Sequence, residues 1–511
     1  MAAFEASHDD GPSEVPDDFT RWKALAKYSA GDEARRLSMT FAGYRASWFA
    51  TDGYPQRALD RGYLTRFGTL DASDGGRTQQ YMLVASSRRT DDRQHLDIGA
   101  YGRYYDLDLF SNLTFWTRSP ESGDQIWQAD RRTSIGGHAI SSRFLGRRAG
   151  AVEVTAGAQV RHDLARVRLR NTVDRVPQAK TVLSGAPLPA VVYDDRIADT
   201  SMSPFADLRL RPLAWLRANI GVRADTVRMR VVSDRTENSG TTWASIVTPK
   251  ASVILGPWRA TEIYANAGSG FHSNHAAGVM QRVDPLTGSA IRADGTIVAG
   301  SPPLVCTVGA EAGIRTELGT ILRTSIALWL LDSDSELIYT AEDGVTSPER
   351  PGRRYGIEWL NVLQLRSWLG ADLDAAWSHA RYRTDPLREG RLIPDAAAAV
   401  VGGGVTVSRS RIGAAIRARY VGRRPLLPSG HSFMEGSSIV NGQAEVRVSS
   451  RVRINVQAFN IFDRRYEDTA YYFATRLRDP NTGIVEHDAV GDYVTHPGQP
   501  RTVRAGLRIV F

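Results

Sequence analysis

The sequence predicts an all-β protein: an antiparallel transmembrane β-barrel of roughly 19 strands, with short turns at one rim and long loops at the other. Two observations support this. Apolar residues recur at every second position, and the connections between these segments alternate between short and long. The mean hydropathy of −0.31 agrees, because a barrel wall needs only one lipid-facing residue in two. No run of 18 apolar residues indicates a transmembrane helix.

Alternation is clearest where small and branched residues share one face and polar residues the other. Such segments are AVEVTAGAQV at 151–160, LRANIGVRA at 216–224, and residues 308–314, 444–448 and 452–458. The final segment, TVRAGLRIVF at 502–511, follows the same rule and ends on the aromatic Phe511. A soluble β-sandwich also alternates in this way, so alternation alone leaves both architectures open.

The connections distinguish the two architectures. Short connections are expected at 29–35, 90–94, 144–149, 211–213, 256–260, 317–320, 367–369, 408–411 and 449–451. Long connections are expected at 49–78, 116–126, 164–195, 233–244, 270–303, 341–353, 383–396, 422–437 and 463–499. A sandwich has no reason to alternate its loop lengths, whereas an outer-membrane barrel places short turns in the periplasm and long loops outside.

The first strand is expected at residues 19–30, after a flexible N-terminal segment at 1–17. Residues 18–511 are expected to form one barrel domain, because no long Pro/Ser tract or acidic block separates a further one. The start of the sequence shows neither a basic n-region nor an apolar h-region, so no export signal is recognised in the chain as given.

The composition argues against several functional classes. A single cysteine, Cys306, excludes an internal disulfide. The formal charge of +8 permits nucleic-acid binding, but the arginines alternate with apolar residues along strands, so a nucleic-acid partner is not expected. The sequence contains no G-x-S-x-G motif and no phosphate-binding glycine loop, so neither an enzyme nor a cofactor is expected.

Five stretches in order resemble the strand signatures of one family, the TonB-dependent outer-membrane receptors. They are TEIYANAGSGFHSN at 261–274, RRYGIEW at 353–359, ARYVGRRP at 418–425, FNIFDRRY at 459–466 and HPGQPRTVRAGLRIVF at 496–511. The residues that carry the resemblance are Gly268, Gly270, Gly356, Glu358, Asn460, Phe462, Asp463 and Tyr466. The resemblance covers roughly residues 18–511, and the terminal Phe511 resembles the signal read by the barrel-assembly machinery.

Elementary conformational reasons account for some of these motif residues. Gly268 and Gly270 would let a strand bend where it leaves the membrane. Asn460 and Asp463 can cap the turn from strand to loop through side-chain hydrogen bonds. These expected roles concern the fold and name no substrate.

The resemblance implies an outer-membrane location and a barrel of 22 strands with a plugged lumen. No plug, TonB box or signal peptide is recognised, so the chain is expected to be the C-terminal portion of a longer receptor; alternatively, the strand count is off by one. The implied partners are the TonB complex acting through that plug, outer-membrane lipids and lipopolysaccharide, the barrel-assembly machinery, and a small anionic or metal-chelate substrate.

The two longest loops supply the candidate substrate-binding residues: His272, Asn274 and His275, and then Tyr471, Tyr472, His487, Asp488 and His496. Histidine and carboxylate can bind a transition metal, while aromatic residues and arginines can hold an anionic ferric chelate. No compact ligand spacing specifies a metal, so ordinary loop polarity remains the alternative. Arg57, Arg61 and Arg66 could likewise attract anions or lipopolysaccharide phosphates, or be solvated.

The function expected from the resemblance is TonB-energised uptake of a scarce solute, typically an iron–siderophore chelate. The alternative is a passive porin-like channel or a non-functional truncated barrel. Porins have 16–18 strands around an open lumen, and the strand motifs favour the receptor.

Overall fold

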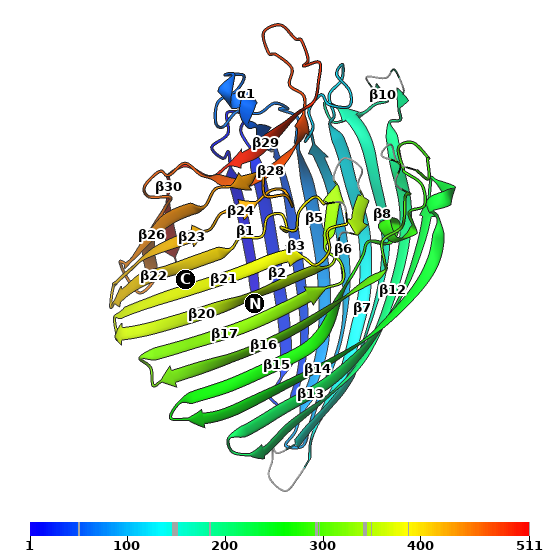
Figure 1. Ribbon diagram of the computed structural model, residues 1–511. Coiled ribbons are helices and arrows are strands. Elements are labelled where there is room, and N and C mark those ends of the chain that lie inside the picture. The colour runs from blue at the N-terminus through cyan, green and yellow to red at the C-terminus, as the bar shows by residue number, and fades with distance from the viewer. Residues whose placement is uncertain are drawn as a thin grey trace.

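The wall of the molecule is one antiparallel sheet that curves into a barrel (Figure 1). The computed structural model describes residues 1–49, 52–145, 152–182, 185, 187–291, 295, 297–340, 345–348, 350–386 and 388–509. Of the 21 strands in the sheet, the two-residue β9 only extends the end of β8, so 20 described strands form the wall.

Each wall strand pairs with the next one along the chain. The wall strands are β1 (Ala2–Asp9), β2 (Phe19–Gly31), β3 (Arg35–Phe49), β5 (Gly75–Thr90), β6 (Gln94–Ser111), β7 (Ile126–Leu145), β8 (Val152–Val173), β12 (Val191–Leu213), β13 (Leu216–Ser233), β14 (Gly240–Trp258), β15 (Thr261–Ser273), β16 (Leu304–Leu318), β17 (Leu322–Ser333), β20 (Gly352–Arg366), β21 (Leu369–Tyr382), β22 (Ala399–Arg409), β23 (Ile412–Val421), β26 (Ser437–Arg447), β27 (Val452–Phe459) and β30 (Thr502–Ile509).

The long loops carry the remaining, shorter elements. These are β4 (Tyr54–Pro55), α1 (Gln56–Asp60), β9 (Val176–Pro177), β10 (Lys180–Thr181), β11 (Pro187–Leu188), η1 (Thr236–Asn238), α2 (Ala276–Met280), β18 (Leu337–Thr340), β19 (Val345–Pro348), β24 (Arg424–Pro425), β25 (Phe433–Met434), β28 (Glu467–Thr475) and β29 (Val490–Pro497).

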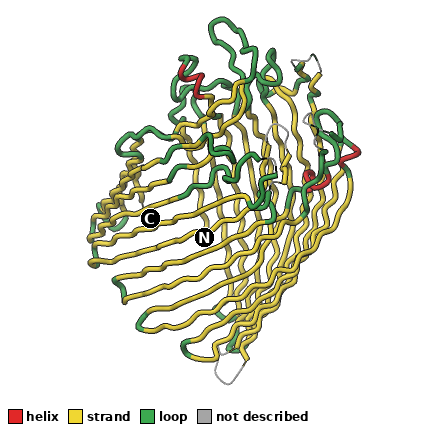
Figure 2. The backbone as a smooth tube through the Cα atoms, in the orientation of Figure 1, coloured by secondary structure: helices red, strands yellow, loops and turns green. Residues whose placement is uncertain are grey.

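The alternation of short and long connections is confirmed. The loops gather at the upper rim and the turns at the lower rim (Figure 2). The turns joining β12 to β13 and β20 to β21 leave only residues 214–215 and 367–368 outside the strands, while residues 460–501 form the longest loop. The expected turn at 144–149 lies largely outside the described residues.

The predicted count of roughly 19 strands agrees with the 20 described wall strands, whereas residues 2–9, expected to lie in a flexible segment at 1–17, form a strand. These residues form β1, which pairs with β2 from Ala2–Ala26 to Asp9–Phe19. The pattern was weak because β1 is short and contains alanine and acidic residues, which have low strand propensity. Because the number of described wall strands is even, β1 begins and β30 ends toward the rim of short turns.

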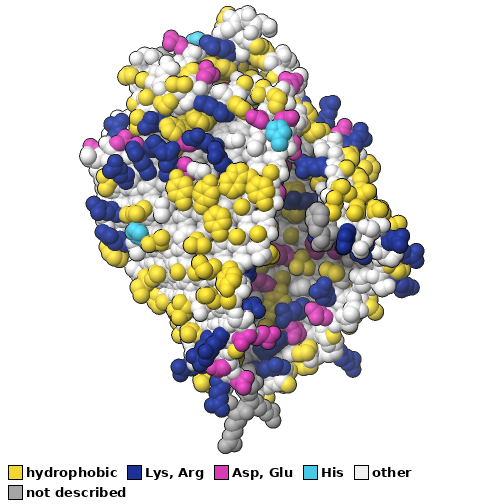
Figure 3. Space-filling model, turned by 180° about the vertical axis from the view of Figure 1, so that it is seen from behind, with side chains coloured by type: hydrophobic (Ala, Val, Ile, Leu, Met, Phe, Trp, Pro, Cys, Tyr) yellow, Lys and Arg dark blue, Asp and Glu magenta, His cyan; other side chains and the backbone are white. Residues whose placement is uncertain are grey.

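The two faces of the wall differ as a membrane barrel requires. Large apolar side chains such as Leu328, Val160 and Ile416 are more than half exposed on one face. Seen from behind, hydrophobic side chains form a band across the wall, with lysines and arginines above and below it (Figure 3). Because a bilayer would cover such a band, this face is the lipid-facing one. Among the described helices, none is long and apolar enough to cross a membrane.

A charge on this band is expected to destabilise the barrel. Leu328→Arg, on β17 with its side chain 59% exposed, should lower the free energy of unfolding in lipid vesicles by roughly 2–4 kcal/mol if it lies near the bilayer midplane. Gln443→Arg, which adds the same side chain on the lumen side of β26, should change it little. Urea titrations of both variants test this, and equal costs would contradict the assignment of faces.

β1 and β30 form the two edges of the sheet. Among the described residues no ladder joins them, although Arg504 Nη2 lies 3.1 Å from Asp9 Oδ2 at their outer ends. Seen from behind, the wall is interrupted by an opening through which charged interior side chains are visible (Figure 3). Hydrocarbon offers no hydrogen-bond partner, so in a bilayer both edges need protein partners.

Candidate functional site: the outer mouth and inner wall

The inner face of the wall is polar and largely ion-paired. Pairs between neighbouring or next-nearest strands include Lys250–Asp207 at 2.8 Å, Arg209–Glu153 at 2.7 Å and Arg417–Asp372 at 2.5 Å. These residues alternate along their strands with exposed apolar residues, so they point to the opposite side, the lumen. Carboxylates and guanidinium groups that neutralise each other fix the shape of this surface and leave little charge free for a ligand.

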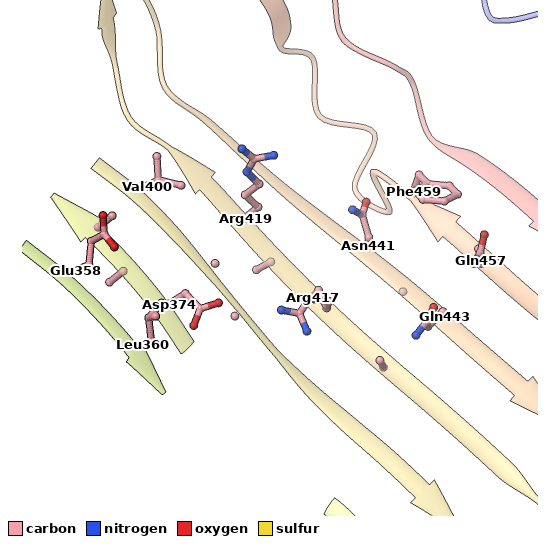
Figure 4. Close-up of a pocket in the computed structure, with 17 residues that line it drawn as sticks. Glu358, Leu360, Asp374, Val400, Arg417, Arg419, Asn441, Gln443, Gln457 and Phe459 are labelled. Atoms are coloured by element: carbon pink, nitrogen blue, oxygen red, sulfur yellow. The ribbon is translucent and has the colours of Figure 1, made fainter. Parts of the chain in front are cut away.

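One cavity of about 470 Å³ lies on the inner wall of the C-terminal half (Figure 4). Six strands from β20 to β27 contribute to it, and its polar lining is Glu358, Asp374, Arg417, Arg419, Asn441, Gln443 and Gln457. Among the described residues, Arg417 is paired with Asp372, but Arg419 is exposed and forms no ion pair or hydrogen bond. Arg419 is therefore a free guanidinium near the outer end of β23, available to an anion.

The loop between β15 and β16 folds back against the inside of the neighbouring part of the wall. Its helix α2 packs Ala276, Val279 and Met280 against inward-facing residues of β8, β12 and β13, including Met229 and Val231. This apolar burial holds the loop against the wall.

A second anchor of the same loop comes from Asn238, in η1. Its Oδ1 accepts hydrogen bonds from the main-chain N–H groups of Arg282 (2.7 Å) and Val283 (3.0 Å), and its Nδ2 donates to Val283 O at 3.1 Å. Asn238 was not predicted, because its partners lie more than 40 residues away and no local pattern marks it.

The longest loop folds as a hairpin, β28–β29, that leans on the loop between β3 and β5. β29 pairs with β4 through Val494–Pro55 and Thr495–Tyr54. Arg57, in α1, forms ion pairs with Glu486 at 2.7 Å and Asp492 at 2.9 Å, and its side chain is 13% exposed. Neither interpretation offered for Arg57, attraction of external anions or a solvated side chain, fits the structure, because protein carboxylates already occupy its guanidinium.

Arg61 and Arg66 are also engaged within the mouth. Arg61 Nη1 donates to Glu486 Oε1 at 2.6 Å, and Arg66 Nη2 donates to the main-chain oxygens of Tyr466 and Gly498. Arg61 remains 45% exposed. The first long loop thus uses its arginines chiefly to bind the last long loop.

The candidate residues of the β15–β16 loop lie at the mouth, in different surroundings. Asn274 is buried, and its Nδ2 donates to Pro302 O at 2.5 Å, which closes the base of the loop. His272 Nε2 is buried and has no hydrogen-bond partner among the described residues. The side chain of His275 reaches solvent, yet the enclosing protein, aided by Arg132, lowers the pKa of His275, so its imidazole is neutral at neutral pH.

The candidates of the last loop are mostly on the outside of the hairpin. Tyr471 is 56% and Tyr472 39% exposed. His487 and Asp488 are fully in solvent near the loop tip, 3.0 Å from each other. His496 lines a separate cavity of about 430 Å³ with Phe19, Tyr44 and Trp48. No hydrogen bond or ion pair among the described residues joins this group to the His272 group.

The described part of the chain holds one compact group of three potential metal ligands, His8, Asp10 and Asp18, and all three side chains are exposed. None of the predicted loop residues belongs to it. Exposed groups of this kind are strongly hydrated, so it gives no support for a predicted metal centre.

Most motif residues have structural roles. Asn460 has a φ of +48° and Asp463 a φ of +50°; Asn460 Nδ2 donates to Arg464 O and Gln499 O, and Asp463 Oδ1 accepts from Arg501 N. The predicted capping is thus confirmed. Phe462 is 73% exposed.

The glycine motifs also shape the wall. A Cβ on Gly356 would lie 2.3 Å from Trp377 O and 2.9 Å from the Trp329 ring, so no side chain fits there. At Gly268 the pairing of β15 with β14 ends, while pairing with β16 continues past Gly270 without a register shift. The strand therefore separates from β14 at Gly268, and the bend expected at these glycines stays a prediction. Glu358 lines the inner-wall cavity, Tyr466 packs beside Gly498, and Phe511 lies outside the described residues.

Comparisons with known proteins agree with this geometry. The family model described as "TonB dependent receptor-like, beta-barrel" matches residues 10–461. The unliganded ferric citrate transporter FecA superposes with a TM-score of 0.76 at 13% identity, covering 99% of this chain and 72% of that one. The ferric yersiniabactin receptor FyuA from Yersinia pestis gives 0.72 at 13%, covering 100% and 74%. The copper transporter OprC gives 0.71 at 14%, covering 100% and 75%.

No curated protein matches the sequence closely enough to be related by that comparison. At 13–14% identity the three structures show a shared fold. The family model, however, matches far more than half of the sequence, and the strand motifs, loop alternation and lumen lie where such a barrel has them. The chain therefore belongs to the TonB-dependent receptor β-barrel family.

Proposed function

We propose that the chain forms the barrel of an outer-membrane receptor that takes up an anionic metal chelate, such as an iron–siderophore complex, with energy from TonB. Family membership supports the receptor class. The observation that carries the choice of an anion is Arg419, a free guanidinium that projects into the inner-wall cavity below the loops. A guanidinium pairs well with carboxylate or catecholate oxygens, which it can bind through two hydrogen bonds at once.

The loop residues complete the proposed route. The candidate contacts during capture from outside are His272, His275, Tyr471, Tyr472, His487, Asp488 and His496. Asn274 shapes the β15–β16 loop. Proteins of the same fold include transporters of ferric citrate and of copper. In this proposal TonB acts through a plug contributed by another segment.

The open seam supports a further part of this proposal, that strands of another protein segment complete the wall between β1 and β30. The two edges run antiparallel, so either direct pairing or an even number of inserted strands satisfies both ladders. An odd number would leave one pair parallel.

The test is accumulation of radioactive ⁵⁵Fe by the host bacterium, supplied as ferric citrate and as a ferric catecholate, with and without a protonophore. Wild-type cells are expected to take up at least one chelate, and the gene deletion and the protonophore should each abolish this uptake. Arg419→Ala should raise the half-saturation concentration roughly tenfold or more, since a charge-assisted hydrogen bond contributes about 1.5–3 kcal/mol. Gln443→Ala, in the same cavity, should raise it much less.

The outcomes separate the two functional classes. Uptake that persists with the protonophore would indicate a passive channel. Equal uptake of both chelates by wild-type and deleted cells would contradict iron-chelate transport. An unchanged half-saturation concentration for Arg419→Ala would remove the inner-wall cavity from the substrate route.

A further inference from the structure

A cluster of three aspartates, of which Asp74 is buried and Asp52 and Asp71 are partly buried, lies at the outer ends of β3, β5 and β6, and none of its residues lines the inner-wall cavity. Asp52 follows β3, Asp71 lies in the same loop, and Asp74, only 1% exposed, directly precedes β5. Asn112, which follows β6 and is 3% exposed, completes the cluster.

Only neutral groups donate to these carboxylates. Asp74 Oδ2 accepts from the main-chain N–H of Asn112 at 3.2 Å, and Asp74 Oδ1 accepts from Gln125 Nε2 at 3.0 Å. Asp71 Oδ2 accepts from Asn112 Nδ2 at 2.9 Å, and Asp71 Oδ1 accepts from the Ser73 hydroxyl at 2.6 Å.

The nearby cations do not neutralise the cluster directly. Arg175 donates to the main-chain oxygens of Ser73 and Asp74. Lys180 Nζ donates to the main-chain oxygens of Gly123 and Gln125. None of the ion pairs found among the described residues includes Asp52, Asp71 or Asp74.

Two buried oxygens in the cluster have no hydrogen-bond partner, Asp52 Oδ2 and Asn112 Oδ1. Since Asn112 Nδ2 is held by Asp71, its Oδ1 is fixed beside the same carboxylates. Buried acceptors left unpartnered are costly and call for a positive partner. Here the unpartnered atoms are a carboxylate oxygen and an amide oxygen, which are ligands that Ca²⁺ prefers.

The pKa values of Asp52 and Asp74 are shifted in the direction expected for carboxylates without a cation beside them. Burial raises the pKa of both Asp52 and Asp74, and their mutual repulsion raises that of Asp74 further. Two buried carboxylates this close can share a site only with a proton or a cation between them.

We propose that Asp52, Asp74 and Asn112 bind a divalent cation of the Ca²⁺ type, and that Asp71 orients the Asn112 amide toward it. Asp71 is not assigned as a direct ligand, because the ligand atoms of Asp52, Asp71 and Asp74 do not all lie within 4.8 Å of one another. Ca²⁺ takes 6–8 oxygen ligands, so main-chain oxygens and water would supply the rest. The ion would tie the loop after β3 to the loop after β6 and stiffen this side of the mouth.

The test is titration of the calcium-free, detergent-folded chain with CaCl₂, followed by calorimetry and by the thermal unfolding midpoint. The wild type is expected to bind Ca²⁺ saturably, with a dissociation constant at or below about 10⁻³ M, and to become more stable. Asp52→Asn should weaken binding at least roughly tenfold, because even an outer partner of a metal ligand contributes that much. Asn112→Ala, which keeps every charge, should do the same.

Asp10→Asn is the matched control, because it changes the exposed group of His8, Asp10 and Asp18 and should leave Ca²⁺ affinity unchanged. Heat-modifiability on gels shows which variants fold. If Asp52→Asn does not fold, the Ca²⁺ affinity of Asn112→Ala tests the proposal instead. Absence of saturable binding to the wild type, or wild-type affinity in both cluster variants, overturns the proposal. So does a midpoint that depends on pH between 5 and 8 equally with and without Ca²⁺, which would indicate a shared proton.

Discussion

Arg57→Ala is expected to release the β28–β29 hairpin from the mouth while leaving the barrel wall folded. Arg57 donates to both Glu486 oxygens, to Asp492 Oδ2, and to the hydroxyl and main-chain oxygens of Thr475. Glu486 and Asp492 are 17% and 15% exposed, so both would lose a cation in a poorly hydrated place. Removing one partner from a buried pair costs about 3–5 kcal/mol, and the residual exposure here reduces this to roughly 2–4 kcal/mol.

The measurement is hydrogen–deuterium exchange of the β28–β29 amides. A loss of this size should accelerate exchange by on the order of 10²-fold, at about 1.4 kcal/mol per tenfold, while the amides of β7 and β8 stay protected. Arg57→Lys keeps the charge but not the planar fork and should fall between wild type and Arg57→Ala. Arg61→Ala removes a cation that is 45% exposed and leaves Glu486 paired with Arg57, so it should cost at most about 1 kcal/mol. Equal exchange in wild type and Arg57→Ala would show that the hairpin is held by other contacts.

The same contact has a defined dependence on pH. Burial alone would raise the pKa of Glu486, but hydrogen bonds from Arg57, the Leu477 main-chain N–H and Arg61 outweigh it and lower the pKa. A carboxyl whose pKa is lowered by folding contributes stability above its unfolded pKa, about 4.3 for Glu. That contribution is lost as the pH falls through the folded pKa. Hairpin protection should therefore hold at neutral pH and fall below about pH 4 in the wild type, with a weaker fall in Arg57→Ala.

The wall could be predicted from the sequence because its rules are local. The period of two and the turn residues identify nearly every strand, and each expected turn that the structure describes lies at the short-turn rim. β1 was not predicted because its eight residues alternate only weakly and precede a Gly/Pro-containing run that is typical of coil. In the mouth, Arg57 and Glu486 lie 429 residues apart, and nothing local marks either as a partner of the other.

The candidate site shows the same limit. Histidine and tyrosine mark a loop as chemically versatile, but only the folded chain shows that Asn274 is used in closing a loop and that His487 stands in solvent. Arg419 was part of a quoted motif, yet its lack of an ionic partner depends on which residues five other strands present to the cavity. A sequence pattern predicts which face of the wall a residue occupies. The charge balance of the lumen depends on ion pairs between strands, which form only in the folded barrel.

Asn460→Ala is expected to destabilise the barrel by roughly 3–5 kcal/mol without changing what each folded barrel does. Asn460 is 3% exposed with a φ of +48°. Its amide donates to Arg464 O at 2.9 Å and Gln499 O at 3.0 Å and accepts from Arg464 N at 2.9 Å. Alanine in the left-handed region costs about 1–2 kcal/mol, and three main-chain groups, on Arg464 and Gln499, would lose their hydrogen bonds to Asn460 at up to about 1 kcal/mol each.

Companion variants at the same turn separate the two causes. Asn460→Gly removes the backbone strain and keeps the hydrogen-bond loss, so it should be about 1–2 kcal/mol more stable than Asn460→Ala. Asp463→Ala carries the same backbone strain, because Asp463 has a φ of +50°, but it loses only one hydrogen bond, from Arg501 N, and should cost less than Asn460→Ala. Urea titrations of the detergent-folded chains give these differences, and a cost below about 1 kcal/mol for Asn460→Ala would show that the turn is held by other contacts.

Uptake per folded barrel should be unchanged in all three variants, whereas Arg419→Ala should lower uptake at low substrate concentration and leave stability unchanged. That contrast follows from the positions of the two residues: Asn460 caps a strand end at the outer rim, and Arg419 faces the lumen without a partner.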